Sequence, residues 1–287
     1  MTNPPPSYPG PLQAALLTLL GSFLALLALA AVAPLVTPTA ALGLASVLGL
    51  GAAGALGATR VPRPHGARVG LRGLQRRHFV PLLLLLPVAL LASEVDNAVL
   101  ALFPAPDAPQ LAQQVRERLP TDAGLALVES LLVAVGLVPL VEEWLFRGVI
   151  QQGLVARLGA PGGVCLTALF FALGHGGPGM SAGSWTALTA QVFAMGLVFG
   201  VARHKTGSLL AAVFVHVGVN LAGVLGLAYA GAVPIPGYNA PGAHTPAAAL
   251  APAVLSVALG LWLLARAPTP RIPESTAAGE PEDGPGR

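Results

Sequence analysis

The sequence predicts an all-α protein, a polytopic transmembrane helix bundle of about eight helices. Two observations carry this prediction. Only 9% of the 287 residues are charged and 54% are hydrophobic, whereas a soluble domain carries about 25% charged residues. Apolar stretches also recur along the chain, near the length of about 20 residues that a helix needs to cross about 30 Å of hydrocarbon.

The apolar stretches place the helices in order. We expect them at residues 12–36, 39–58, 79–102, 123–141 and beyond, 163–174, 184–201, 207–230 and 246–266. The fifth is short as written, so we expect it to start near Pro161 and to include His175 at or near its end. The first is too long for a signal-peptide core, and no basic side chain precedes it, so it is interpreted as a retained helix.

The two ends of the chain differ in composition from the rest. Residues 1–11 and 267–287 are rich in Pro, Gly, Ser and Glu and carry little apolar surface, so we expect disordered tails around one transmembrane domain, residues 12–266. The single Cys165 cannot form an internal disulfide and is expected to be a small core residue.

Basic residues predict the orientation in the membrane, because Lys and Arg concentrate in short cytoplasmic loops. Six arginines lie between the second and third expected helices, and others follow the Glu142–Glu143 pair, the sixth helix and the eighth, whereas only Arg116 and Arg118 fall on the other side. We therefore expect a multi-pass protein of the plasma (inner) membrane with both termini cytoplasmic. The net charge of +3 gives no reason to expect nucleic acid as a partner, because topology explains the arginines.

The strongest functional signal is the carboxylate pair Glu142 and Glu143, followed by Arg147 at the end of an apolar stretch. A charge inside a bilayer costs about 2.5–3.5 kcal/mol on insertion scales, so a functional site is the default explanation. The spacing of four predicts that Glu143 pairs with Arg147, whereas Glu142 points about 140° away and is left free for chemistry. The alternative is that both acids pair structurally or face water at the helix end. Pro139 removes the hydrogen bond to the carbonyl of Val135, which would kink the helix or open its backbone beside the site.

Two further segments supply partners for these carboxylates. His175 ends one apolar stretch, and His216 and Asn220 lie four apart on one face of another, where they are suited to hold a developing oxyanion. A lone His in a helix is more often a packing residue, but here two histidines accompany the Glu pair. Phe171 lies one turn before His175, where it either packs on the imidazole or is ordinary core. Together, Glu, Arg, His and Asn point to hydrolysis.

The motifs Glu-Glu-x-x-x-Arg at 142–147, Phe-x-x-x-His at 171–175 and His-x-x-x-Asn at 216–220, in this order, resemble the type II CAAX prenyl endopeptidases and bacteriocin-processing enzymes, the CPBP or Abi family. The resemblance covers about residues 123–230 and implies an intramembrane endopeptidase whose four-helix catalytic core carries added helices. It further implies that Glu142 is the catalytic base, acting on water with help from His175. His216 and Asn220 would then stabilise the tetrahedral intermediate, and Glu143, Arg147 and Phe171 would support the site.

The cofactor and substrate are less closely specified. Glu142, His175 and His216 are candidate zinc ligands, but the chain lacks a His-Glu-x-x-His helix, so we favour a glutamate-activated water with no obligatory metal. The expected substrate is a peptide or a membrane protein reached from the lipid bilayer. The excess of Arg over Lys, with abundant Ala, Gly and Pro, suggests a GC-rich bacterial genome, where prenylated substrates are unexpected.

Two other function classes fit the sequence less well. A catalytically silent scaffold or immunity protein of the same fold would not need the intact motifs, and an ion or solute transporter would be expected to show internal repeats. Ser181 lies in a Gly-x-Ser-x-Gly pattern, but the strand–turn–helix context of a serine hydrolase is absent. We expect other polar residues in these helices to line a water-filled cavity: Glu94, Asp96, Asn97, Glu129 and Gln191. For Glu94, Asp96 and Asn97 the alternative is that the third helix leaves the membrane there.

Overall fold

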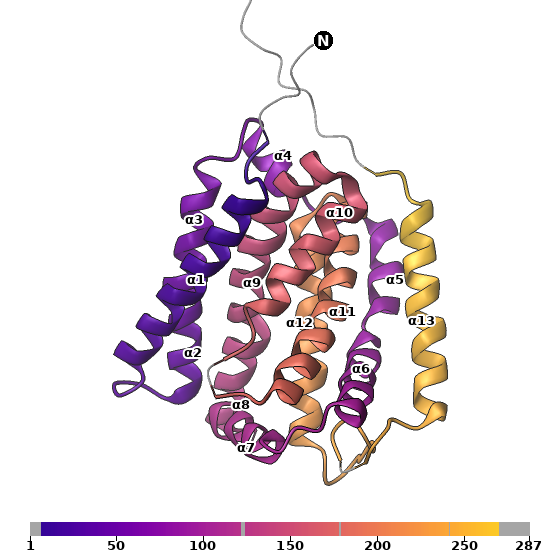
Figure 1. Ribbon diagram of the computed structural model, residues 1–287. Helices are drawn as coiled ribbons and strands as arrows, with labels where there is room; N and C mark the ends of the chain where they lie inside the picture. The colour runs from indigo at the N-terminus through magenta and orange to yellow at the C-terminus, as the bar shows by residue number, and fades with distance from the viewer. Residues whose placement is uncertain (1–6, 122–123, 178, 241, 270–287) are drawn as a thin grey trace, which may run out of the picture.

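The computed structural model describes residues 7–121, 124–177, 179–240 and 242–269. Within these ranges the chain is helical, with a single isolated β-bridge between Pro236 and Ala240 and no β-strand, and the helices form one upright bundle (Figure 1). In order, the elements are α1 (Pro11–Val32), α2 (Pro38–Ser46), η1 (Val47–Gly51), α3 (Ala52–Ala58), α4 (His65–Val69), α5 (Arg76–Leu85), α6 (Val88–Leu102), α7 (Ala108–Arg118), α8 (Leu125–Ser130), η2 (Leu131–Leu137), α9 (Val138–Glu143), η3 (Trp144–Ile150), α10 (Gln151–Leu173), α11 (Ala182–Thr206), α12 (Leu209–Ala228) and α13 (Ala247–Arg266).

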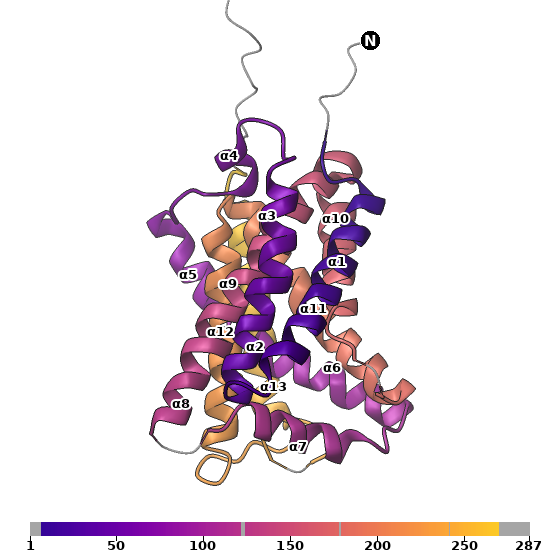
Figure 2. The same cartoon turned by 90° about the vertical axis from the view of Figure 1, so that its left-hand side faces the viewer.

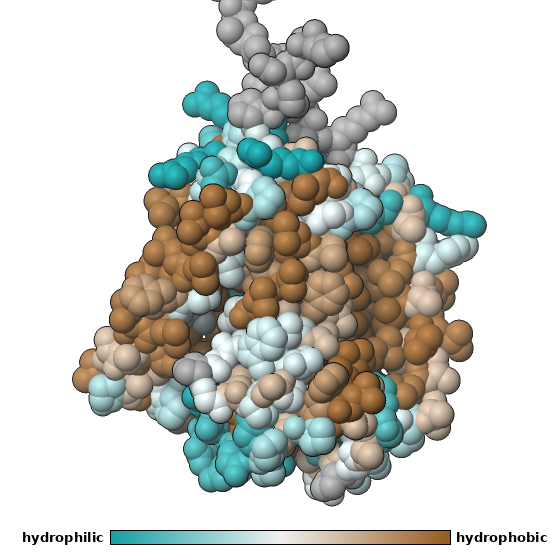
Figure 3. Space-filling view, viewed as in Figure 1, coloured by the Kyte–Doolittle hydropathy of each residue, from teal (hydrophilic) through white to brown (hydrophobic). Residues whose placement is uncertain are grey.

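The helices have the length and composition of membrane spans. Seven of them in the described part of the chain are long and apolar enough to cross a bilayer. On the face shown in Figure 3, a broad hydrophobic band lies between two hydrophilic ends, as expected where lipid replaces water as the solvent. The prediction of an all-α polytopic bundle is confirmed.

The fourth and fifth expected helices lie in one helical run. Leu125–Leu173 contains 49 residues, or about 73 Å of helix, which is more than twice the thickness of the hydrocarbon core. The run is broken at Gly159, whose φ of 72° and ψ of 171° are not helical. Glycine tolerates this backbone because it has no Cβ. The second limb ends at Leu173, so His175 follows directly after it, close to where it was expected.

The first limb contains two wider, π-helical turns, η2 and η3, on either side of α9. Every residue from Leu145 to Ile150 is buried, so η3 lies at the centre of the bundle and presents no face to lipid. Arg147 is one of these residues. It therefore lies inside the protein, not in a loop after the Glu pair, and does not report on topology as the sequence suggested.

The described ends of the chain lie together with the arginine-rich loop (Figure 2). Arg157 donates hydrogen bonds to the carbonyl of Ser7, and Lys205 contacts Thr269 at 3.4 Å. Residues 7–10 therefore pack against α10 rather than belonging to a disordered tail, while residues 1–6 and 270–287 lie outside the described residues. Cys165 is exposed, so the expectation that it is a core residue is wrong.

The loop that follows His175 is fastened at its far end. Asp107, just before α7, accepts hydrogen bonds from the backbone of Ser181 at 2.8 Å and from the hydroxyls of Ser181 at 2.5 Å and Ser184 at 2.7 Å. The bonds from Ser181 and then Ser184 lower the pKa of Asp107 to about 2. Ser181 also caps α11 through its side chain, which gives the serine of the Gly-x-Ser-x-Gly pattern a structural role.

The two ends of the bundle can be distinguished by cysteine labelling. A Cβ at Gly73 or at Gly231 would meet no atom within 4 Å. The variants Gly73→Cys and Gly231→Cys, each made in a Cys165→Ala background, should therefore fold. Gly73 lies in the arginine-rich loop and Gly231 follows α12 at the opposite end. We expect a membrane-impermeant maleimide to label Gly231→Cys in right-side-out vesicles, and Gly73→Cys only after detergent opens them. Labelling of Gly73→Cys in sealed vesicles would contradict the predicted orientation and place the arginine-rich loop outside.

Candidate active site

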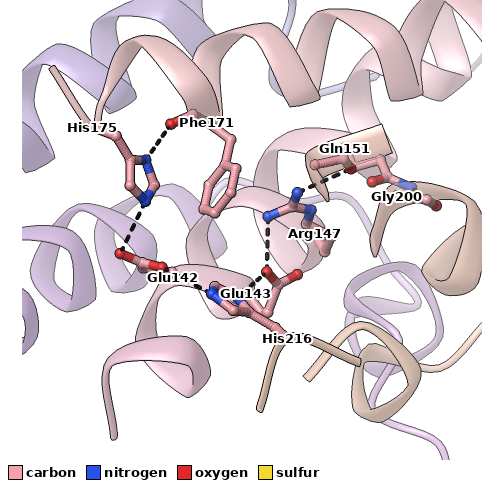
Figure 4. A network of polar contacts seen from close by, with 9 residues as sticks. Glu142, Glu143, Arg147, Gln151, Phe171, His175, Gly200 and His216 are labelled. Carbon is pink, nitrogen blue, oxygen red and sulfur yellow. Dashed lines mark hydrogen bonds and ion pairs between the residues drawn. The ribbon is translucent and has the colours of Figure 1, made fainter. Parts of the chain in front are cut away.

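Four separate segments meet at the centre of the bundle. Glu142 and Glu143 end α9, Arg147 lies in η3, Phe171 lies near the end of α10 with His175 just after it, and α12 carries His216 and Asn220. Figure 4 shows Glu142 turned toward the imidazoles and Glu143 turned toward the guanidinium of Arg147. The structure thus brings six of the seven motif residues into one cluster, and Asn220 lies one helical turn after His216 on α12.

Glu142 faces both histidines. Its Oε1 lies 4.0 Å from Nε2 of His175, and its Oε2 lies 3.7 Å from Nε2 of His216. The side chain of Glu142 is 12% exposed and that of His175 is 31% exposed, so this part of the cluster is more exposed than the Glu143–Arg147 pair. Both imidazoles are oriented through their other nitrogen, because Nδ1 of His175 contacts the carbonyl of Phe171 and Nδ1 of His216 contacts Glu143, each at 2.8 Å. One carboxylate and two ring nitrogens therefore converge on a single, partly exposed space.

Glu143 forms the buried ion pair that the spacing of four predicts. Its Oε1 accepts a hydrogen bond from Nη1 of Arg147 at 2.8 Å, and both side chains are fully buried. The same oxygen contacts His216, so one carboxylate atom holds both the guanidinium and an imidazole. A second hydrogen bond runs from Nη2 of Arg147 to the carbonyl of Gly196 at 3.1 Å. Oε1 of Glu143 is thus engaged twice, whereas its buried Oε2 has no hydrogen-bond partner in the described residues.

Two glycines let α11 approach these polar groups. A Cβ on Gly196 would lie 3.3 Å from Nη2 of Arg147, and one on Gly200 would lie 3.0 Å from Oε1 of Gln151. Gln151 donates to the Gly200 carbonyl at 2.9 Å. Small residues four apart commonly allow close helix contacts in membranes. Gln151 was not singled out in the sequence, although its place four residues after Arg147 extends the Glu143–Arg147 stripe.

Aromatic rings enclose the polar cluster. Phe199 stacks on His216 with centroids 4.6 Å apart, and Phe171 meets the edge of His175 at 4.6 Å. The guanidinium carbon of Arg147 lies 4.2 Å from the ring centroid of Phe171, within cation–π range. Phe171 therefore contacts the imidazole as well as belonging to the core. Phe199 has no sequence signal that would have identified it, since it is one of many apolar residues in its helix.

Asn220 is held by an irregular piece of backbone. Its amide nitrogen donates to the carbonyl of Ala134 at 2.8 Å. In the π-helical register of η2, where Val138 N–H bonds the carbonyl of Val133 five residues back, the N–H opposite Ala134 would come from residue 139. That residue is Pro139, which has no N–H. The carbonyl opened by the proline is therefore that of Ala134 and not of Val135, and it fixes Asn220 while leaving the second amide hydrogen available.

The remaining polar residues are dispersed. Glu94 contacts His244 at 2.7 Å and accepts from the backbone of Thr245 at 2.8 Å, so it fastens the loop before α13. Asn97 belongs to the same group, and Asp96 is half-buried on α6. Glu129 accepts from the hydroxyl of Thr37, away from Glu143. In a regular α-helix Glu129 would lie within about 40° of the same face as Glu143, fourteen residues later, but the intervening π-helical η2 changes the rotation per residue.

Two cavities adjoin the cluster. One of about 360 Å³ is lined by Gln191 and Asn220 as well as by Tyr238 and Asn239, and it borders α7. Another of about 550 Å³ is mainly apolar and includes Val141 and Trp144, the neighbours of the Glu pair in sequence. Gln191 thus lines a cavity together with the site residue Asn220.

Donor types and geometry give different answers about a metal at this cluster. The donor types of Glu142, His175 and His216 match those of catalytic zinc centres. Within the described ranges, however, no group of three or more His, Cys, Asp or Glu side chains has the geometry to hold a metal.

One comparison with known proteins finds a match over the region that contains the candidate site. No curated protein and no solved structure matches the chain. The model of one protein family, described as Type II CAAX prenyl endopeptidase Rce1-like, matches residues 124–222, a range that contains all seven motif residues and about a third of the chain. Over this central region, the sequence matches the Rce1-like family, as its motifs predict.

Proposed function

We propose that the protein is an intramembrane endopeptidase that hydrolyses a peptide bond with a water activated by Glu142. The observation that carries this proposal is the convergence of the Glu142 carboxylate with Nε2 of His175 and of His216, at 4.0 and 3.7 Å. The match of residues 124–222 to a family of endopeptidases supports it. The substrate class that follows is a peptide or a membrane protein.

In the proposed hydrolysis, Glu142 and His175 have separate roles. Glu142 accepts a proton from a water molecule while the oxygen of that water attacks the scissile carbonyl carbon, which is general-base catalysis. His175, the more exposed imidazole, orients that water from the other side. The tetrahedral intermediate then collapses, the C–N bond breaks, and Glu142 returns the proton to the leaving amine. The products are a carboxylate and an amine.

The oxyanion is stabilised from α12. The Asn220 amide donates one hydrogen to Ala134 and keeps a second, and His216 is held in place by Glu143. Donors fixed before the reaction stabilise the transition state without reorganisation, and losing one costs about 2.7–4 kcal/mol. Glu143 and Arg147 act indirectly, because they hold His216.

Glu142→Gln should abolish proteolysis without unfolding the protein. The substitution keeps the side-chain size and removes the base, so the cleavage rate should fall by about a hundred-fold to ten-thousand-fold. The substrate is identified in the same experiment, by comparing peptides released from membranes that contain the parent or the variant. Glu129→Gln, at a carboxylate bonded to Thr37 outside the cluster, is the matched control. Near-parental cleavage by Glu142→Gln would refute the assignment.

Arg147→Ala should lower stability, whereas His175→Ala should lower turnover only. Removing Arg147 leaves Glu143 buried and uncompensated, a loss of about 3–5 kcal/mol in soluble proteins. His175 is about one-third exposed and its removal strands no charge. Thermal unfolding and cleavage are measured on the same samples, with Arg77→Ala, at an exposed arginine, as control. If Arg147→Ala melts like the parent but is inactive, Arg147 belongs to the chemistry or to substrate binding.

Chelation should leave activity unchanged if the water is activated by Glu142 without a metal. The protein is treated with 1,10-phenanthroline and EDTA and dialysed, and its metal content is measured by mass spectrometry beside its cleavage rate. A rate that falls after chelation and returns with stoichiometric zinc would make Glu142, His175 and His216 zinc ligands instead.

A further inference from the structure

A separate cavity of about 120 Å³ lies at the end of the bundle that carries both described ends of the chain. Its lining contains Arg68 and Arg72 from the loop around α4, and Arg203 and His204 from the last turn of α11. Gln151, Gln152 and Thr269 add hydrogen-bonding groups to the wall. The positive charge gathered here has no part in the proposed hydrolysis.

No carboxylate lines this cavity in the described residues. Acidic side chains in the described part of the chain lie in the catalytic pair or in elements from α6 to α8: Glu94, Asp96, Asp107, Glu117, Glu129, Glu142 and Glu143. Arg147 also borders the cavity, but its charge is matched by Glu143. The charges of Arg68, Arg72 and Arg203 therefore have no described counter-ion.

Arg203 is the residue that marks a built site. It is only 7% exposed, and its Nη2 donates to the carbonyl of Arg68 at 2.7 Å, whereas its Nε has no partner. The chain passes tightly around it at Gly70, whose φ is +88° and where a Cβ would lie 2.5 Å from the guanidinium carbon. A loop arginine that only sets topology needs no such burial. Burying an arginine without a counter-ion is costly, and a bound anion would offset that cost.

We propose that this cavity binds a phosphate ester, from a membrane phospholipid headgroup or as free phosphate, between Arg68, Arg72 and Arg203. Guanidinium groups bind phosphate through paired, charge-assisted hydrogen bonds. The location fits, because Arg203 and His204 lie in the last turn of a membrane-spanning helix, at the level where headgroups meet water. The volume exceeds that of a single water site. The hydrophilic cap at this end is visible in Figure 3.

The test is thermal unfolding of the purified full chain in an uncharged detergent. Short-chain phosphatidic acid, inorganic phosphate and sodium chloride are titrated separately at matched ionic strength. A ligand that binds only the folded state raises the melting temperature with its concentration. We expect phosphatidic acid or inorganic phosphate to raise it and chloride not to. A response to the lipid alone assigns a headgroup, and an equal response to both assigns free phosphate. No response to either overturns the proposal.

Variants distinguish phosphate binding in the cavity from a general effect of surface charge. Arg72→Gln should weaken the phosphate response at least about tenfold, since one charge-assisted contact is lost; its side chain is half-buried. Arg203→Gln should do the same if it folds. Arg76→Gln, which removes the same charge from an exposed site outside the cavity, is the control and should leave the response intact. Equal loss in Arg72→Gln and Arg76→Gln would mean nonspecific screening and refute the site.

The carboxylates of the C-terminal segment are the competing occupant. Residues 270–287 continue from Thr269 at the cavity wall and include Glu274, Glu280, Glu282 and Asp283. A chain ending at Thr269 is titrated beside the full chain. We expect both to respond to phosphate. If only the shortened chain responds, the segment itself fills the cavity in the intact protein, and the proposal of a phosphate ligand is overturned. Because no catalytic residue is changed, these outcomes are independent of the proposed hydrolysis.

Discussion

The buried ion pair between Glu143 and Arg147 is the interaction on which the rest of the site depends. Both side chains are fully buried, so each would be untenable without the other. Arg147 also donates a hydrogen bond to the carbonyl of Gly196, which requires that α11 approach closely. Glu143 in turn contacts His216. One electrostatic requirement thus joins η3, α9, α11 and α12. Glu142 is then free to face the more exposed side of the cluster, because its neighbour already neutralises the guanidinium.

Irregular backbone is the second constraint on the site. The π-helical turns around α9 and the proline at its start open one carbonyl of the first limb, and Asn220 fills that position. π turns are often found at functional sites. Here the irregularity fixes the amide of Asn220, which an unbroken α-helix would leave without this partner. Asp107 likewise fixes the loop that follows His175, because it accepts hydrogen bonds from Ser181 and Ser184.

Charge is distributed along the bundle in three zones. Basic residues gather at the end that carries residues 60–77, Glu142 and Glu143 lie in the middle, and the other described acids lie toward α6, α7 and α8. The first zone favours a cytoplasmic location. It also contains Arg203, whose burial has no topological purpose and which therefore suggests a bound anion. A single segregation of charge thus bears on both orientation and binding.

The sequence by itself determined the all-α membrane fold, the approximate helices and the motif residues. It did so because hydrophobic length and the cost of intramembrane charge are local properties. The Glu143–Arg147 pair was equally predictable, since it needs only four residues of one helix. Tertiary structure alone decided that Glu142 faces two histidines from other segments, that Phe199 stacks on His216, and that Ser7 to Gly10 pack on α10. It also decided that Glu129 bonds Thr37 instead of sharing a face with Glu143, because the π-helical η2 between them alters the helical phase in a way that no periodicity reveals. These features depend on contacts between residues far apart in sequence, for which the order of side chains along one helix holds no information.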